Sequence, residues 1–108
     1  MKSIMLVCAA GMSTSLLVNK MKEAAKNKNL ELDIFAIATQ EVEEYINKKE
    51  IDVVLLGPQV RFMKADLEKK LAPKNIPLAV IEMTDYGMMN GARVLDTALR
   101  LMIEDGSK

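Results

Sequence analysis

The sequence contains no histidine, no tryptophan and a single cysteine. Without histidine, the chain cannot supply the imidazole of a Ser-His or Cys-His catalytic pair, nor a histidine ligand for zinc. A single cysteine excludes a disulfide within the chain and any metal site built on a pair of thiolates. We therefore expect neither a metal nor a cofactor, and any covalent chemistry must proceed without an imidazole from this chain.

An excess of one charge and a long hydrophobic run are missing as well. Lys plus Arg and Asp plus Glu number 15 each, so no basic surface for nucleic acid or anionic lipid is indicated. No apolar run approaches the roughly 20 residues of a membrane span, and the short stretch after Lys2 is no signal peptide. We expect a cytoplasmic monomer that binds no nucleic acid, with residues 1–108 forming one domain.

Apolar runs typical of strands alternate with amphipathic stretches typical of helices. Helices are expected at about residues 14–28, from Thr39 as N-cap to about Lys49, from about Val60 to Pro73, and at about residues 91–103. Residues 82–90 are expected to form a loop. Strands are expected at about residues 3–7, 30–37, 53–56 and 78–81.

The strand pattern predicts a four-stranded parallel sheet inside a three-layer α/β/α sandwich. The strands at Ile4 and Val53 are apolar on both faces, as central strands covered by helices are, whereas the strand at Leu30 alternates like an edge strand. Together with right-handed crossovers, these features favour the flavodoxin-like order 2-1-3-4. Ligands bind such sheets beyond the carboxyl ends of the strands where the order reverses, which here is beside Cys8.

Cys8 follows the first strand and precedes a turn of small residues that leads into a helix. Backbone N–H groups in such a turn converge on an anion, and the helix dipole stabilises both a phosphate and a thiolate there. Two plainer interpretations stay open: a free cysteine often fills a core, and Ser or Thr here can be a helix cap. We predict that Cys8 is a nucleophile beside a phosphate-binding segment formed by Ala9, Ala10, Gly11, Met12, Ser13, Thr14 and Ser15.

The spacing in this segment is similar to the loop of tyrosine-phosphatase-type enzymes, in which Cys and Arg are separated by five residues. Here Thr14 occupies the position of that arginine, and Ser15 follows it. A guanidinium would stabilise the charge of a transferring phosphoryl group. Without it, the loop can hold a phosphate but is poorly equipped to hydrolyse a thiophosphate ester, as suits a carrier.

Two other loops should reach the same edge of the sheet. Arg61 either enters the crevice or lies on a solvated helix face, and Asp85 and Tyr86 either supply an acid and a stacking ring or belong to a polar turn. Methionines on these segments either fill the core or suit an adaptable docking surface; they are Met12, Met63, Met83, Met88 and Met89. The candidate crevice or partner contacts are Pro58, Gln59, Arg61, Asp85 and Tyr86.

The segments 8–17, 53–60 and 86–91 resemble the IIB components of the sugar phosphotransferase system, lactose/cellobiose (chitobiose) class, and the resemblance covers nearly the whole chain. It implies that Cys8 takes a phosphoryl group from a phosphohistidine of a IIA component. Cys8 would then pass the group to a β-linked disaccharide bound by a membrane IIC component, at the inner face of the membrane. The missing histidine and membrane span both agree with this.

Two other functions remain open from the residues alone. The spacing from Cys8 to Ser15, together with Asp85, is compatible with a small cysteine phosphatase or an arsenate-reductase-like enzyme. A flavodoxin-like ligand binder with an inert Cys8 is the third possibility.

Overall fold

The computed structural model describes residues 1–9 and 12–106 and shows one parallel sheet. Its four strands lie in the predicted order β2-β1-β3-β4, so the predicted topology is confirmed. In the register of the sheet, Cys8 at the end of β1 lies beside Ala38 at the end of β2. The strands are β1 (Lys2–Cys8), β2 (Leu32–Ala38), β3 (Val53–Leu56) and β4 (Leu78–Val80).

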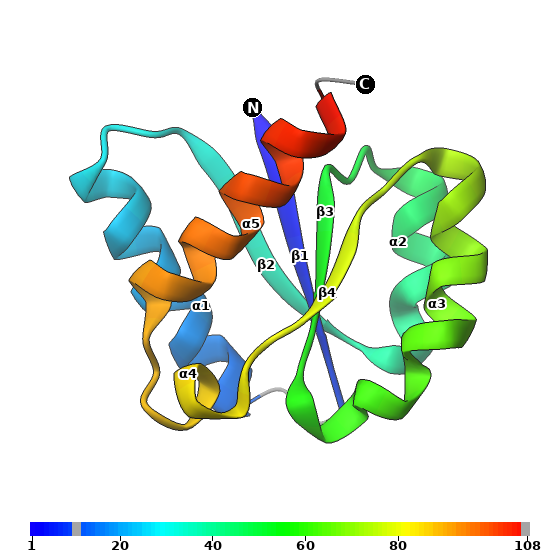
Figure 1. Ribbon diagram of the computed structural model, residues 1–108, viewed down its shortest axis with the longest axis horizontal. Helices are drawn as coiled ribbons and strands as arrows, with labels where there is room; N and C mark the ends of the chain where they lie inside the picture. Colours follow the sequence, from blue (N-terminus) through cyan, green and yellow to red (C-terminus); the bar gives the residue numbers. More distant parts are fainter. Residues whose placement is uncertain (10–11, 107–108) are drawn as a thin grey trace.

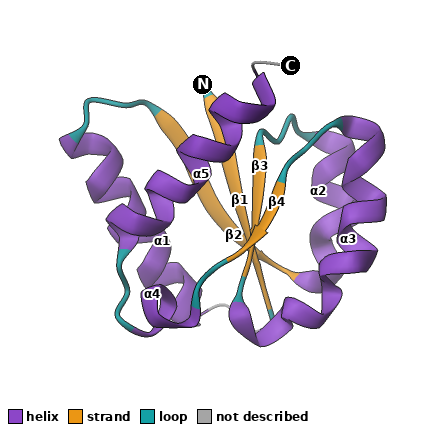
Figure 2. Ribbon diagram, in the orientation of Figure 1, coloured by secondary structure: helices purple, strands orange, loops and turns teal. Residues whose placement is uncertain are grey.

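Helices cover both faces of the sheet and complete the predicted three-layer sandwich (Figures 1 and 2). On one face lie α1 (Met12–Asn27) and α5 (Gly91–Gly106), and on the other lie α2 (Val42–Lys48) and α3 (Lys64–Leu71). None of the helices in the described parts of the chain is long and apolar enough to cross a membrane. The described residues also form four short helices: η1 (Thr39–Glu41), η2 (Pro58–Met63), η3 (Ala72–Lys74) and α4 (Met83–Gly87).

The side chains of the two central strands, β1 and β3, pack in two separate hydrophobic cores, one on each face of the sheet. This explains why both strands are apolar on both faces. In β1, Ile4 and Leu6 pack in the core under α1 and α5, whereas Met5 and Val7 pack in the core under α2 and α3. All four side chains are fully buried. Successive residues of a strand point to opposite faces, so one apolar run supplies both layers. The sheet therefore fixes the carboxyl end of β1, where Cys8 lies, from both sides.

The prediction of a loop over residues 82–90 is wrong, because α4 forms within it. The Tyr86 N–H donates to the Glu82 carbonyl at 2.9 Å, and the Met88 N–H donates to the Thr84 carbonyl at 3.0 Å. Asp85 and Tyr86 are buried, so this segment packs against the molecule. A single helical turn satisfies these backbone groups within the segment.

Two predicted helices also differ from the structure at their amino ends. Thr39 is not an N-cap: η1 begins there, and the Ala38 N–H donates to Glu41 Oε1 at 3.0 Å. The helix predicted from about Val60 is divided, because Val60 has φ −117° and ψ 22° within η2 and the regular helix α3 begins only at Lys64. The spacing of this segment predicts core positions at Val60, Met63, Leu67 and Leu71; Val60, Leu67 and Leu71 are buried, and Met63 is partly buried against the same core.

Candidate functional site

Cys8 lies where the sequence places it, at the carboxyl end of a central strand, but its side chain is buried. Only 2% of the residue is exposed. The thiol donates a hydrogen bond to the carbonyl oxygen of Ile37 on β2, with a sulfur-to-oxygen distance of 3.6 Å. This bond uses the thiol hydrogen, which a substituted sulfur lacks. The sulfur in this state faces a neighbouring strand and not solvent.

The predicted phosphate-binding segment connects Cys8 to α1, which begins at Met12. Ala9 is exposed, whereas Ala10 and Gly11 lie outside the described residues, as do the side chains of Met12 and Ser13. The amino end of α1 lies at the edge where the strands end (Figure 1), as an anion site there would require. Phosphate binding by Ala9, Ala10, Gly11, Met12, Ser13, Thr14 and Ser15 stays a prediction.

A buried pair of hydroxyl groups links the first turn of α1 to α4. The distance between Thr14 Oγ1 and the Tyr86 hydroxyl oxygen is 3.2 Å, and either group can donate. Thr14 is 1% exposed and Tyr86 is 8% exposed. Thr14 occupies the position where the phosphatase-type loop has arginine, so that position holds a neutral side chain with a partner inside the protein.

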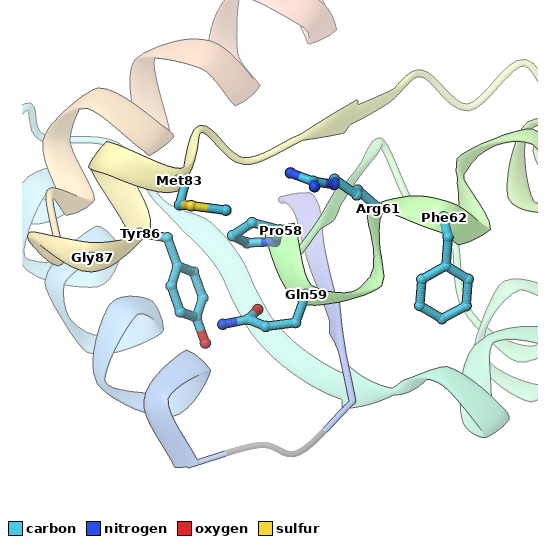
Figure 3. Close-up of a pocket in the computed structure, with 7 residues that line it drawn as sticks. All are labelled: Pro58, Gln59, Arg61, Phe62, Met83, Tyr86 and Gly87. Carbon is cyan, nitrogen blue, oxygen red and sulfur yellow. The ribbon is translucent and has the colours of Figure 1, made fainter.

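A pocket of about 600 Å³ opens beside this pair and contains four of the predicted crevice residues. Figure 3 shows that Tyr86 points its hydroxyl toward the start of α1, and that the carboxamide of Gln59 is directed toward Tyr86. We call this cavity the edge pocket. It is lined by Pro58, Gln59, Arg61, Phe62, Met83, Tyr86 and Gly87.

Gly57 separates the edge pocket from Cys8. Its N–H donates to the Val7 carbonyl at 2.8 Å. A Cβ atom added to Gly57 would lie 3.8 Å from the Cys8 Cβ and 3.3 Å from Gln59 Oε1. Gly57 therefore lies close to both the Cys8 side chain and the carboxamide of Gln59.

Asp85 does not line the edge pocket. Its carboxylate Oδ1 lies 3.3 Å from Arg93 Nε, and the side chain is 12% exposed. It lines a separate cavity that also contains Glu82 and Arg100. Asn90, next to it in space, caps α5, because its Oδ1 accepts a hydrogen bond from the Arg93 N–H at 3.2 Å. Asp85 thus supports the start of α5, and the structure does not bring it together with Tyr86 in the pocket.

The sequence interpretation missed two residues that line the pocket, Phe62 and Gly87. Phe62 is 77% exposed, and no spacing marks it, because its direction follows from the break at Val60. Met83 and Met88, two of the methionines for which the sequence left core and docking roles open, are 62% and 75% exposed. Of the other three methionines, Met63 and Met89 are half-buried, and the Met12 side chain lies outside the described residues.

Comparison with known proteins identifies close relatives along almost the whole chain. Residues 3–97 match the family described as "PTS system, Lactose/Cellobiose specific IIB subunit". The chain is 48% identical over 104 residues to the "PTS system cellobiose-specific EIIB component" of Lactococcus lactis subsp. lactis, covering 94% of this chain and 96% of that protein. It is also 48% identical over 104 residues to the "PTS system galactose-specific EIIB component" of Lactococcus lactis subsp. cremoris, with the same coverage of 94% and 96%.

A solved structure agrees in fold as well as in sequence. The cellobiose-specific phosphotransferase IIB component from Borrelia burgdorferi is 45% identical, with a TM-score of 0.78. The similarity covers 96% of this chain and 94% of that one.

Proposed function

The chain belongs to the lactose/cellobiose-specific IIB family of the phosphotransferase system, a family of phosphotransferase components, and we propose that it carries a phosphoryl group on Cys8. The donor is a phosphohistidine of a IIA component, and the acceptor is a sugar bound by a membrane IIC component. The observation that carries this proposal is the position of the chain's single thiol, at the carboxyl end of a central strand and at the entry to α1.

Both transfer steps balance without any other reactant. In the first step, the Cys8 sulfur forms a bond to phosphorus while the nitrogen–phosphorus bond of the donor breaks. The thiol loses its proton, and the imidazole that leaves gains one. In the second step, a sugar hydroxyl oxygen forms the bond to phosphorus, the sulfur–phosphorus bond breaks, and the proton of the hydroxyl returns to sulfur.

Phosphorylation also removes a contact of the resting protein. The Cys8 thiol donates to the Ile37 carbonyl, but a sulfur that carries a phosphoryl group has no hydrogen to donate. The phosphorylated sulfur therefore no longer makes the hydrogen bond that directs it toward β2. A charged phosphoryl group in a position that is 2% exposed needs hydrogen-bond donors, and the backbone N–H groups at the entry to α1 are the predicted ones.

Two features favour a carrier over a cysteine phosphatase. The position of the phosphatase arginine holds Thr14, a buried residue bonded to Tyr86. Asp85, the candidate general acid, is paired with Arg93 outside the edge pocket. Thr14 and Asp85 therefore do not stabilise charge or protonate a leaving group as the corresponding phosphatase residues would, and this favours slow hydrolysis of the thiophosphate ester.

We propose a β-linked disaccharide of the cellobiose type as the final acceptor. The cellobiose-specific relatives in Lactococcus and Borrelia support this class. The galactose-specific relative is as similar to this chain as the cellobiose-specific one, so overall identity does not separate the sugars. This agrees with the proposal that the IIC component selects the sugar.

Mass spectrometry tests the carrier proposal directly. Incubation with phosphorylated IIA should add one phosphate to the wild-type chain and none to Cys8→Ser. An adduct of equal yield on Cys8→Ser would rule out Cys8 as the carrier. Rapid hydrolysis of an aryl phosphate that is lost in Cys8→Ala would instead favour the phosphatase. Slow alkylation by iodoacetamide does not identify an inert binder, because the resting sulfur is buried.

A further inference from the structure

The hydroxyl pair of Thr14 and Tyr86 joins two segments that are far apart in the chain. The residues are separated by 72 positions, and the two oxygens lie 3.2 Å apart in a buried environment. No buried side-chain nitrogen or oxygen among the described residues lacks a hydrogen-bond partner. Removing either hydroxyl would leave the other without this partner away from water, which is costly. The pair therefore holds the two segments in one relative position.

The position of this bond gives it a consequence for Cys8. Thr14 lies in the first turn of α1, the helix that follows Cys8 and directs its amino end toward the edge of the sheet. Tyr86 belongs to α4, which follows β4 at the same edge. Asn90 ties α4 to the start of α5, because its N–H donates to the Asp85 carbonyl at 2.8 Å. Through Tyr86, the first turn of α1 is thus anchored to an element fixed independently of the cysteine segment.

We propose that Tyr86 is a positioning residue for phosphoryl transfer: its hydroxyl, acting through Thr14, fixes the amino end of α1 relative to the Cys8 sulfur. This inference rests on the proposed function, and it adds to it the group that aligns the site. Transfer requires the sulfur, the phosphorus and the stabilising N–H groups in one geometry, and a misplacement of about 1 Å can cost up to about 100-fold in rate. Tyr86 touches neither sulfur nor phosphoryl group in this role.

The variant Tyr86→Phe removes the oxygen and keeps the ring that packs in the core. The chain offers a matched control in Tyr45→Phe, since the sequence contains two tyrosines. Tyr45 lies on α2 and packs on Phe35 with ring centroids 5.5 Å apart, in the core on the other face of the sheet. Thr14→Val removes the other hydroxyl of the pair with little change in shape, and Thr14→Ser retains it.

Two measurements separate alignment from simple stability. Hydrogen exchange of the Leu16 and Leu17 amides should become about fivefold faster in Tyr86→Phe, because the first turn of α1 loses one buried hydrogen bond. At saturating phosphorylated IIA, Tyr86→Phe should accept the phosphoryl group about tenfold more slowly, with KM changed less than twofold. Tyr45→Phe should match the wild type in both measurements, and Thr14→Ser, which keeps the hydroxyl, should match it in hydrogen exchange.

The double variant tests whether the two hydroxyls act as one unit. If they do, Tyr86→Phe combined with Thr14→Val is no slower than Thr14→Val alone. Multiplied effects, unchanged exchange at Leu16 and Leu17, or a transfer rate of Tyr86→Phe equal to that of Tyr45→Phe would overturn the inference. If the wild type accepts no phosphoryl group, the carrier proposal fails by itself, and the exchange data still decide whether Tyr86 holds the first turn of α1.

Discussion

Among the glycines that the structure places, Gly91 has the closest contact with the backbone of another helix. A Cβ atom added to this first residue of α5 would lie 2.5 Å from the carbonyl carbon of Lys20 and 2.6 Å from the Met21 nitrogen, both in α1. The described glycines Gly57, Gly87 and Gly91 all have negative φ. The requirement for glycine at position 91 is therefore one of space and not of backbone conformation.

The cost of Gly91→Ala follows from this distance. Non-bonded carbons approach to about 3.5–4.0 Å, so the new methyl group would force α1 and α5 apart by about 1 Å. On its other side α1 cannot retreat, because Leu17 and Met21 are fully buried against the sheet. Overpacking of this kind costs about 1–3 kcal/mol, and the better helix propensity of alanine returns up to about 1 kcal/mol. We expect a net loss of about 1–2 kcal/mol, which lowers Tm by about 5–15 °C in a domain of this size.

Thermal unfolding followed by far-ultraviolet circular dichroism measures this loss. Gly87→Ala is the matched control, because a Cβ atom at Gly87 meets nothing within 4 Å. Its free energy of unfolding should stay within about 0.5 kcal/mol of the wild type. A Gly91→Ala protein that unfolds at the wild-type temperature would refute the reasoning, and so would an equal loss in Gly87→Ala.

Three further predictions concern stability and can be measured by urea unfolding. Leu67→Ala should lower the free energy of unfolding by about 2–5 kcal/mol, because it leaves a cavity in the core under α3. Phe62→Ala, at a position 77% exposed, should change it by less than about 0.5 kcal/mol, and similar losses in the two variants would contradict this. Asn75 has φ 57° and ψ 37° after η3, so Asn75→Ala should cost about 1 kcal/mol and Asn75→Gly should cost nothing; the reverse order would be inconsistent with left-handed strain. The exposed ion pair of Lys48 Nζ and Glu44 Oε1, 3.0 Å apart, should contribute less than about 0.5 kcal/mol to the free energy of unfolding. A larger loss in Lys48→Met would contradict this.

The strand order was predictable because burial leaves a clear signal in strands. The run at Val53 is apolar and buried throughout and occupies a central position, whereas only Ile34 and Ile37 are buried in β2, which lies at the edge. The carboxyl end of β1 then had to lie beside the point where the order reverses. The position of Cys8 therefore followed from the sequence.

The short elements were not predictable, because a segment of a few residues carries no such burial signal in the sequence. Helix α4 comprises five residues, which is too short for a helical period to show in the sequence. Only tertiary packing, which buries Asp85 and Tyr86, makes it form. Likewise, the break in helical geometry at Val60 within η2, two residues before Phe62, has no marker in the sequence.

The candidate site likewise has a part that the sequence could predict and a part that it could not. Its residues were recognisable by type and spacing, but their partners were not, because these come from other elements. The Ile37 carbonyl reaches the Cys8 thiol through the pairing of β1 and β2, and Tyr86 reaches Thr14 through the path of the chain after β4. Contacts between segments far apart in the sequence leave no local pattern.

The contact between the Cys8 thiol and the Ile37 carbonyl also bears on how long an unloaded carrier survives. Peroxides attack cysteines that are ionised and accessible, and they convert them first to sulfenic acid. In the empty protein the sulfur is directed at a carbonyl oxygen and only 2% of the residue is exposed, so it is not accessible to a peroxide. A chain that has one thiol and no second cysteine to repair it by disulfide formation is thereby guarded against oxidative inactivation between two transfers.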